Sequence, residues 1–466
     1  MKFFKITVSF ISALSALLLT SPTSYYSADT ETLLSDDTVS FYTKWKDKYI
    51  IKNPYSDDDQ YYVQYSEETY SDTHTETAVT VSEAHGYGML ITASMSAHDA
   101  EAHDIFDGMY RFYKEHTSSI SGNLMAWQQS DNGSALINSN GNDSASDGDI
   151  DIAYSLLMAD EIWGSQGDIN YHDSAVSIIN DIMKYEVNKT DWIVQLGDWV
   201  YGEDESSKYY SATRSSDFIM QYFPVFAEVT GDERWIKVYD KTYEIITSFT
   251  DEYKTGLLPD FIIKDKNNNF VPAPADFLES ENDGSYYYNS CRCPWRISMD
   301  YLINRESRAL KYAQSISSFF CKTSNGEPMD IFAGYTLDGK ALEDYNDLCF
   351  LAPVLTASAC TDNAEWHDAV RNAVVEYDDD VYFGDTIKML CLIIDDGGWI
   401  VPESNSIIGD VNADGEFNIA DVLLVQKWLL APNDTKLTNW KAADLCEDGV
   451  INTADLSLMK KQLLAK

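Results

Sequence analysis

The sequence predicts an all-α protein with one large helical domain and one small helical module. From about residue 40 to 400, apolar side chains recur mainly with helical spacing, and the alternating pattern of strands is sparse. After residue 407, a loop–helix pattern occurs twice in tandem. About a dozen helices in one domain indicate either an α/α barrel of nested inner and outer helices or an array of helical repeats. No sequence period of about 30–45 residues is visible, which weakens the second interpretation.

The predicted helices of the large domain are separated by long loops rich in aromatic side chains, Asp and Asn. Two of these loops, 129–146 and 263–290, are long enough to suggest a functional role. Residues 29–45 are expected to form a short polar lead. Helices are expected at 83–97, 101–116, 149–164, 172–185, 216–229, 234–249, 295–303, 306–320, 347–358, 363–373 and 383–394.

The N-terminus has the features of an export signal. Lys2 and Lys5 precede an uncharged, largely apolar run from 6 to 19, and small and polar residues follow. The run is too short to span a bilayer, so we expect a secreted protein whose signal peptide is cleaved between 21 and 28. The expected divisions are 1–28 for the signal peptide, 29–400 for the large domain, 401–406 for a linker and 407–466 for the small module.

Composition limits the possible partners. The formal net charge of −43 disfavours binding to nucleic acid, because the chain and the phosphates repel each other. The seven cysteines are scattered and odd in number, which argues against a fully paired disulfide framework.

The two C-terminal loops have the spacing of calcium ligands. A twelve-residue calcium loop supplies oxygen ligands from positions 1, 3, 5, 7, 9 and 12 and has Gly at position 6. A thiol occupies position 3 of the second loop and is a poor calcium ligand, so the second site is expected to be weaker. The predicted ligands are Asp410, Asn412, Asp414, Glu416 (backbone carbonyl), Asn418 and Asp421 in the first loop, and Asp444, Cys446, Asp448, Val450 (backbone carbonyl), Asn452 and Asp455 in the second.

Each loop leads into an apolar-periodic helix, 420–430 and 454–464, and no strong helix pattern precedes the first loop. This arrangement resembles a type I dockerin, the module that plugs enzymes into cohesins on cellulosome scaffolds. The resemblance implies two structural Ca²⁺ ions, a cohesin partner on a scaffoldin, and attachment to a scaffold or cell surface.

Two segments of the large domain carry acidic residues at predicted helix starts. Glu83 lies in the segment 81–90 beside a His, two Gly and a Tyr, and Asp147, Asp149 and Asp151 alternate just before an apolar helix. Each segment alone is compatible with ordinary helix-terminal carboxylates. A carboxyl group among apolar neighbours can also stay protonated and serve as a general acid.

Together these segments resemble glycoside hydrolase family 8. Residues 145–163 match the family signature at every specified position, and 81–90 match its catalytic-acid segment with Ala84 in place of a Gly. The similarity continues through 123–127, 197–199, 213–218 and 286–296. It implies an (α/α)6 barrel with an open cleft and an inverting mechanism on β-linked polysaccharides without a catalytic metal. It also implies that Glu83 is the acid and that Asp147 holds the distorted sugar.

The position of the base departs from many members of the family. They carry Asp where this chain has Asn289, and an amide cannot accept a proton. A subgroup with Asn at this position supplies a Glu ten residues earlier, which corresponds to Glu279, with Glu281 as the second choice. An inverting pair needs carboxyl groups roughly 6.5–9.5 Å apart to admit a water. Asp217 and Asp300 are expected to be structural or subsite groups.

Aromatic and polar residues of the same segments are expected to bind the sugar chain, since sugar rings stack on Trp and Tyr. The favoured substrate is a β-1,4-glucan or a mixed-linkage β-glucan. Chitosan and then xylan are alternatives. The presence of the acid Glu83, of Asp147 and of a candidate base argues against an inactive carbohydrate-binding member of the family. The expected substrate-binding residues are Trp127, Trp199, Tyr87, Arg214, Asp217, Tyr288, Asn289 and Arg292.

Overall fold

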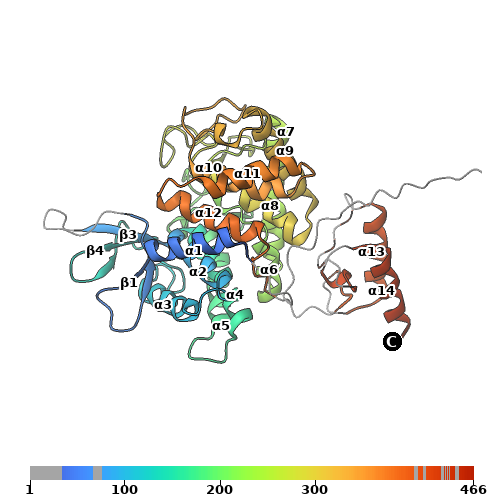
Figure 1. The fold of residues 1–466 in the computed structure, drawn as a ribbon, viewed down its shortest axis with the longest axis horizontal. Coiled ribbons are helices and arrows are strands. Elements are labelled where there is room, and N and C mark those ends of the chain that lie inside the picture. The colour runs from blue at the N-terminus through green and yellow to red at the C-terminus, as the bar shows by residue number, and fades with distance from the viewer. Residues whose placement is uncertain are drawn as a thin grey trace, which may run out of the picture.

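A computed structural model describes residues 34–66, 76–402, 408–412, 416–431, 441–446 and 451–465, together with the single residues 435, 437 and 439. Within these residues, helices α1–α12 build the large domain and α13 and α14 belong to the small module (Figure 1). The expected signal peptide and most of the linker lie outside the described residues. So do three of the predicted calcium ligands, Asp414, Asp448 and Val450.

The helices of the large domain alternate between an inner and an outer ring. Each of the first five inner helices packs against the outer helix that follows it in the chain. The last inner helix, α12, packs against the outer helix α1 and the inner helix α2, which closes the ring. This arrangement is an (α/α)6 barrel and confirms the predicted fold class. The inner helices are α2 (Ser82–Ser94), α4 (Ser146–Trp163), α6 (Tyr222–Thr230), α8 (Cys293–Asn304), α10 (Leu348–Ala359) and α12 (Tyr382–Asp395). The outer helices are α1 (Asp36–Tyr49), α3 (Ala102–Glu115), α5 (Tyr171–Asp181), α7 (Arg234–Tyr253), α9 (Ser307–Thr323) and α11 (Ala364–Glu376).

The sequence of each helix suits its ring. Helices α2, α4 and α10 consist mainly of small and apolar residues and are buried on nearly all sides. Outer helices are amphipathic, as α3 shows by burying Ile105, Phe106, Met109 and Phe112 at helical spacing while its acidic residues face outward. A helix that is apolar all round must be enclosed by other helices, which is the position of the inner ring.

Three sequence expectations need correction. The expected polar lead is in fact α1, which Ser35 caps and which buries Tyr42, Trp45 and Tyr49 on one face. The helix expected from 216 begins only at 222, because Ser215–Asp217 form a separate 3₁₀ turn, η3, that packs against α4 and α8. The helix expected over 172–185 is shorter than predicted: α5 ends at Asp181, and a π-helical turn, Ile182–Glu186, follows it.

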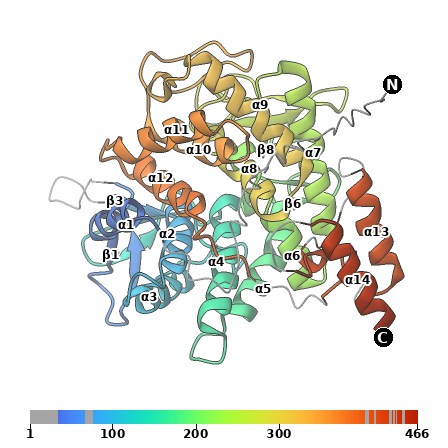
Figure 2. The ribbon, with the colours of Figure 1, turned by 45° about the vertical axis from the view of Figure 1, so that its right-hand side comes forward.

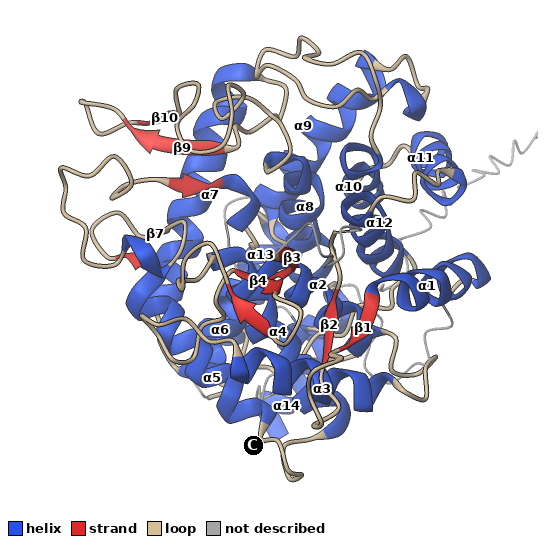
Figure 3. Cartoon of the chain, turned by 90° about the vertical axis from the view of Figure 1, so that its left-hand side faces the viewer, coloured by secondary structure: helices blue, strands red, loops and turns tan. Residues whose placement is uncertain are grey.

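Short antiparallel strands connect some of the helices (Figure 3). Strand β3 leads directly into α2, and β8 pairs with β9 so that Arg214 lies opposite Phe261. These pairings bring two loops to the end of the barrel where the site described below lies. The strands are β1 (Ile50–Lys52) with β2 (Tyr61–Val63), β3 (Thr77–Val81) with β4 (Gln128–Asp131) and β5 (Leu136–Asn138), β6 (Val187–Asn188) with β7 (Ile193–Val194), and β8 (Thr213–Arg214) with β9 (Phe261–Lys264) and β10 (Phe270–Pro272).

The small module has a hydrophobic core of its own. Helices α13 (Ile419–Leu430) and α14 (Thr453–Ala465) pack against each other (Figure 2). Val422, Val425 and Met459 lie in this core. None of the helices in the described part of the chain is both long enough and apolar enough to cross a membrane.

Candidate active site

The predicted acidic residues meet at one end of the barrel. Glu83 is the second residue of α2, Asp147 is the second residue of α4, and Arg292 immediately precedes α8. Successive inner helices are separated by one outer helix and therefore run in the same direction, so their N-termini lie at the same end. Segments that are far apart in the sequence thus contribute to one polar cluster.

Two glycines let α2 and α4 approach closely. A Cβ atom on Gly148 would lie 2.6 Å from the Ser82 carbonyl carbon, and one on Gly86 would lie 2.7 Å from the Cβ of Asp151. Both distances are shorter than real Cβ contacts. The close approach places the first turn of α4, with Asp147, against the first turn of α2, with Glu83.

Arg292 is the centre of the cluster and is only 2% exposed. Its Nη1 donates to Glu83 Oε2 and lies 3.3 Å from both Asp147 Oδ2 and Tyr87 Oη. Its Nη2 donates to Asn289 Oδ1 at 2.9 Å. The rigid fork of the guanidinium therefore fixes the positions of several site residues at once.

Glu83 combines an accessible side chain with the character of a weak acid. The side chain is 19% exposed. Burial raises the pKa of Glu83 to about 7, Arg292 and Arg214 oppose this rise, and the negative charge of Asp147 adds to it. A carboxyl group with this pKa carries its proton through the acidic range and can donate it near neutrality.

Asp147 has the opposite character. Burial alone would raise its pKa, but Arg214 and Arg292 outweigh this effect, and the pKa is lowered. Arg214 Nη2 lies 2.9 Å from Asp147 Oδ1, and the Gly148 amide donates to the same oxygen at 3.0 Å. Asp217 is fully buried and accepts from Arg214 Nε at 3.1 Å, so it supports the arginine. The two carboxyl groups Glu83 and Asp147 thus lie side by side with pKa values pushed apart.

Glu279 and Asn289 are in direct contact. Asn289 Nδ2 donates to Glu279 Oε2 at 2.8 Å, and the Asn289 side-chain oxygen accepts from Arg292. Glu279 is exposed on its loop, so it is accessible to water and to a ligand. Glu281, the second choice for the base, is also exposed but is not the residue that Asn289 contacts.

The aromatic residues of the family segments divide into two groups. Trp127, Trp199 and Tyr288 are partly exposed, and Tyr288 Oη donates to Asp347 at 3.0 Å. Tyr87 is completely buried. Its ring packs against Trp295 and its hydroxyl lies beside Arg292, so the expectation that a sugar stacks on Tyr87 is wrong for this structure. Tyr87 instead forms part of the buried surroundings of Arg292.

Sequence reasoning missed three residues that hold the site in place. The Phe383 ring lies 5.6 Å from the Arg292 guanidinium, and the buried Asp283 accepts the Glu279 amide at 3.0 Å and that of Leu278 at 2.7 Å. The third is Asp260, which is buried next to Asn289. For Asp283 the only signal in the sequence is its position between Asn282 and Gly284, which is typical of many loops. Asp260, between Pro259 and Phe261, has no such signal.

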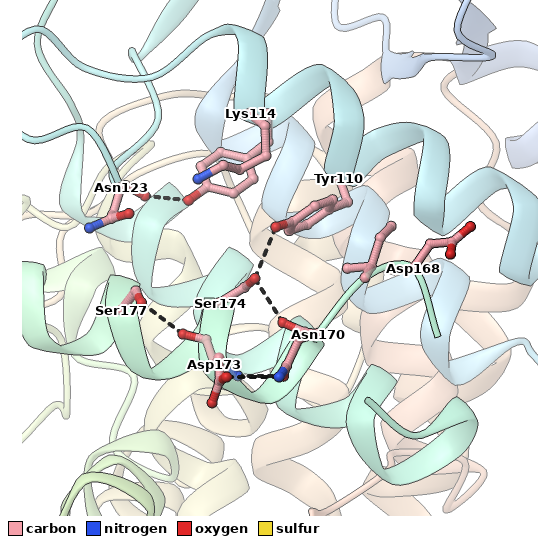
Figure 4. A pocket seen from close by; sticks show the side chains of 10 residues that line it. Tyr110, Lys114, Asn123, Asp168, Asn170, Asp173, Ser174 and Ser177 are labelled. Carbon is pink, nitrogen blue, oxygen red and sulfur yellow. Dashed lines mark hydrogen bonds between the residues drawn. The ribbon is translucent and has the colours of Figure 1, made fainter. Parts of the chain in front are cut away.

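A hollow of about 260 Å³ lies away from this cluster, between α3 and α5. Figure 4 shows that several of its polar side chains bond to one another or to backbone carbonyls of the lining, as Tyr110 does with Ser174 and Ser177 does with the Asp173 carbonyl. These hydrogen bonds already occupy many of the polar groups that line the hollow.

The two loops of the small module are built alike. Asp421 is buried and accepts the amides of Asn412 at 3.2 Å and Asn418 at 2.8 Å. Asp455, at the equivalent position, accepts the amides of Cys446 at 3.1 Å and Asn452 at 2.9 Å.

The first loop offers oxygen donors at each of its described ligand positions. In the second loop, Asp444, Cys446 and Asp455 can each present one ligand atom within 4.8 Å of the others. Carboxylate and carbonyl oxygens fit calcium, whereas the thiol fits it poorly.

Comparisons with known proteins identify the family of each part of the chain. Residues 27–397 match the model of glycosyl hydrolases family 8, and residues 408–464 match that of the dockerin type I domain. A beta-glucanase of Niallia circulans is 41% identical over 373 residues, which cover 79% of this chain and 86% of that protein. Endoglucanase A of Acetivibrio thermocellus is 30% identical over 375 residues, covering 75% of this chain and 72% of that protein.

A solved structure is similar along the large domain. The apo structure of a beta-1,3-1,4-glucanase from Paenibacillus sp. X4 has a TM-score of 0.73 and 40% identity, and the match covers 82% of this chain and 96% of that one. The chain is therefore an inverting glycoside hydrolase with a dockerin. It belongs to glycoside hydrolase family 8.

Proposed function

We propose that the protein is a secreted, cellulosomal endo-β-glucanase that hydrolyses β-1,4 linkages in cellulose or mixed-linkage β-glucan. The observation that carries this proposal is the Arg292-centred cluster, in which a carboxyl group with a raised pKa and an exposed carboxylate are linked through Asn289 and Arg292. The glucanase and endoglucanase names of the similar proteins support a glucan as the substrate.

In the proposed reaction, Glu83 donates its proton to the glycosidic oxygen as the bond to the anomeric carbon breaks. Glu279 accepts a proton from the water that attacks this carbon from the opposite face, so the anomeric configuration inverts in one step. Asp147 stays ionised between Arg214 and Arg292 and holds the distorted sugar at the cleavage subsite. The side-chain amide of Asn289 orients Glu279 through the bond from its Nδ2.

The substrate is tested by measuring reducing-sugar release from lichenan, carboxymethylcellulose, chitosan and xylan in parallel. We expect lichenan or carboxymethylcellulose to give the highest kcat/KM. A preference for chitosan or xylan would replace the proposed substrate while leaving the acid and base assignments in place. Release from none of the four would favour an inactive carbohydrate-binding protein.

The small module is proposed to bind two structural Ca²⁺ ions and a cohesin of a scaffoldin. Asp410, Asn412, Glu416, Asn418 and Asp421, with Asp414 outside the described residues, would hold the first ion. Asp444, Cys446, Asn452 and Asp455, with Asp448 and Val450 outside the described residues, would hold the second. Bound calcium would offset the repulsion among the loop carboxylates and so favour the folded module.

A further inference from the structure

A buried aspartate outside the family segments, Asp260, is hydrogen-bonded to Asn289. Asp260 immediately precedes β9 and is only 3% exposed. Its Oδ1 accepts the Ser290 amide at 2.8 Å, the Ser290 hydroxyl at 2.6 Å and the Tyr287 amide at 2.9 Å. Its Oδ2 accepts the Asn289 amide at 3.1 Å and lies 3.4 Å from Asn289 Nδ2.

These contacts fix both the backbone and the side chain of Asn289. The three donated amides hold the turn 287–290 in one conformation, and the contact with Nδ2 determines which end of the side-chain amide faces Asp260. With the nitrogen on this side, Nδ2 also donates to Glu279, and the carbonyl oxygen is left to accept from Arg292. The opposite orientation of the amide would place its oxygen against two carboxylates and its nitrogen against a guanidinium.

We propose that Asp260 is a positioning residue for the hydrolytic reaction, acting through Asn289 on the carboxylate of Glu279. The inference rests on the proposed function, because it takes Glu279 as the base. A base that is displaced by about 1 Å can lose roughly 10²-fold in rate, so a group that touches no substrate can still affect turnover strongly. Arg292 depends less on Asp260, since its Nη1 contacts Glu83 and Asp147 on two other inner helices.

The test uses Asp260→Asn in the full-length protein. The substitution keeps the size of the side chain but places an NH2 group against N–H donors. We expect kcat on lichenan to fall about 10- to 100-fold with KM changed less than about threefold, because the other residues of the site are unchanged. An unchanged kcat would overturn the proposal.

A double-mutant cycle separates positioning from a general loss of structure. Asp260→Asn in an Asn289→Ala background should cost less than about threefold further, since the residue through which Asp260 acts is gone. If the loss of kcat in the double variant equalled the product of the losses in the two single variants, Asp260 would act independently of Asn289, and the inference would be overturned.

Asp300 is a matched control, because it is a fully buried aspartate that accepts from Tyr239, Tyr243 and Asn304 outside the site. Asp300→Asn should lower Tm and leave kcat within about threefold. If Asp260→Asn gave the same pattern as Asp300→Asn, its role would be structural only. Failure of the proposed function is separate, since it appears as an active Glu279→Ala enzyme whatever Asp260→Asn does.

Discussion

At the scale of single residues, the most informative comparison is between the pKa values of two adjacent carboxyl groups, Glu83 and Asp147. Glu83 and Asp147 both begin inner helices and both contact Arg292, yet burial raises the pKa of one while two arginines lower the pKa of the other. Arg214 accounts for much of this asymmetry, because it pairs directly with Asp147. Adjacent carboxyl groups with separated pKa values are suited to different roles at one pH.

The Glu83→Gln substitution tests the acid. The amide keeps the shape of the side chain but cannot donate the proton, so kcat should fall by about 10²- to 10⁴-fold with an unchanged Tm. Turnover of lichenan and thermal unfolding of the variant provide the two measurements. Retention of more than about a tenth of the wild-type kcat would contradict the assignment.

The pH dependence of kcat/KM tests the electrostatic argument. Because the acid must be protonated, kcat/KM should decline as the pH rises through about 7, following the Glu83 pKa of about 7. Asp147 raises this pKa, so Asp147→Asn should move the alkaline limb to lower pH as well as lower the rate. An alkaline limb that stays in place or moves upward in Asp147→Asn would show that another group controls it.

Replacement of the two loop glutamates distinguishes the proposed base from its neighbour. Glu279→Ala should lose about 10²- to 10⁴-fold in kcat, and added azide, which needs no base, should restore part of the rate. Glu281→Ala is the matched control two residues away and should keep most of the activity. The opposite result would mean that the base is Glu281 and that the contact with Asn289 has another role.

Sequence patterns identified these side chains but not all of their surroundings. Glu83, Asp147 and Arg292 lie in recognisable segments, and their convergence follows from the barrel. Asp260 and Asp283 could not be singled out, because their role depends on which backbone amides the folded loops turn toward them. Tyr87 lies in the same segment as Glu83, and only the packing against Trp295 shows that its ring is buried.

At the scale of elements, helix prediction succeeded where the apolar face was long and failed where local structure changed. Helices α2, α4 and α10 were expected within a few residues of their observed limits. The π-helical turn after α5 was not foreseen, because Ile182 and Met183 continue the apolar pattern of α5 while the backbone hydrogen bonding changes. The 3₁₀ turn η3 was not foreseen either, and it consists of the polar residues Ser215–Asp217 ahead of α6. Helix α1 was missed although Tyr42, Trp45 and Tyr49 have helical spacing.

The contact between α2 and α4 can be tested with Gly148→Ala. The added methyl group would meet the Ser82 backbone, so the helices must separate, at a cost of about 1–3 kcal/mol in the free energy of unfolding. Because Glu83 and Asp147 begin these helices, kcat should fall as well. Gly167→Ala, where nothing lies within 4 Å of the new atom, is the matched control for thermal unfolding and turnover. Equal Tm and kcat in both variants would contradict the close-packing argument.

At the scale of the whole molecule, the chain joins a barrel with its own core to a module with a separate core. The duplicated pattern of the module was visible in the sequence, and the loops show the same hydrogen bonds to Asp421 and Asp455. The single difference in donor chemistry at a described ligand position is Cys446 in place of the Asn412 amide. Sulfur matches a hard cation poorly, so the second site should bind Ca²⁺ more weakly than the first.

Calorimetric titration of the calcium-free full-length protein tests this difference, with two reciprocal substitutions. Wild type should show two affinities for Ca²⁺. Cys446→Asn should raise the weaker affinity toward the stronger one, and Asn412→Cys should weaken the first site in the same way. Neither substitution lies in the barrel, so turnover of soluble lichenan should stay unchanged and serve as the control for folding. If Cys446→Asn left the second affinity unchanged while Asn412→Cys weakened the first, the second loop would obtain its position-3 ligand from a different group.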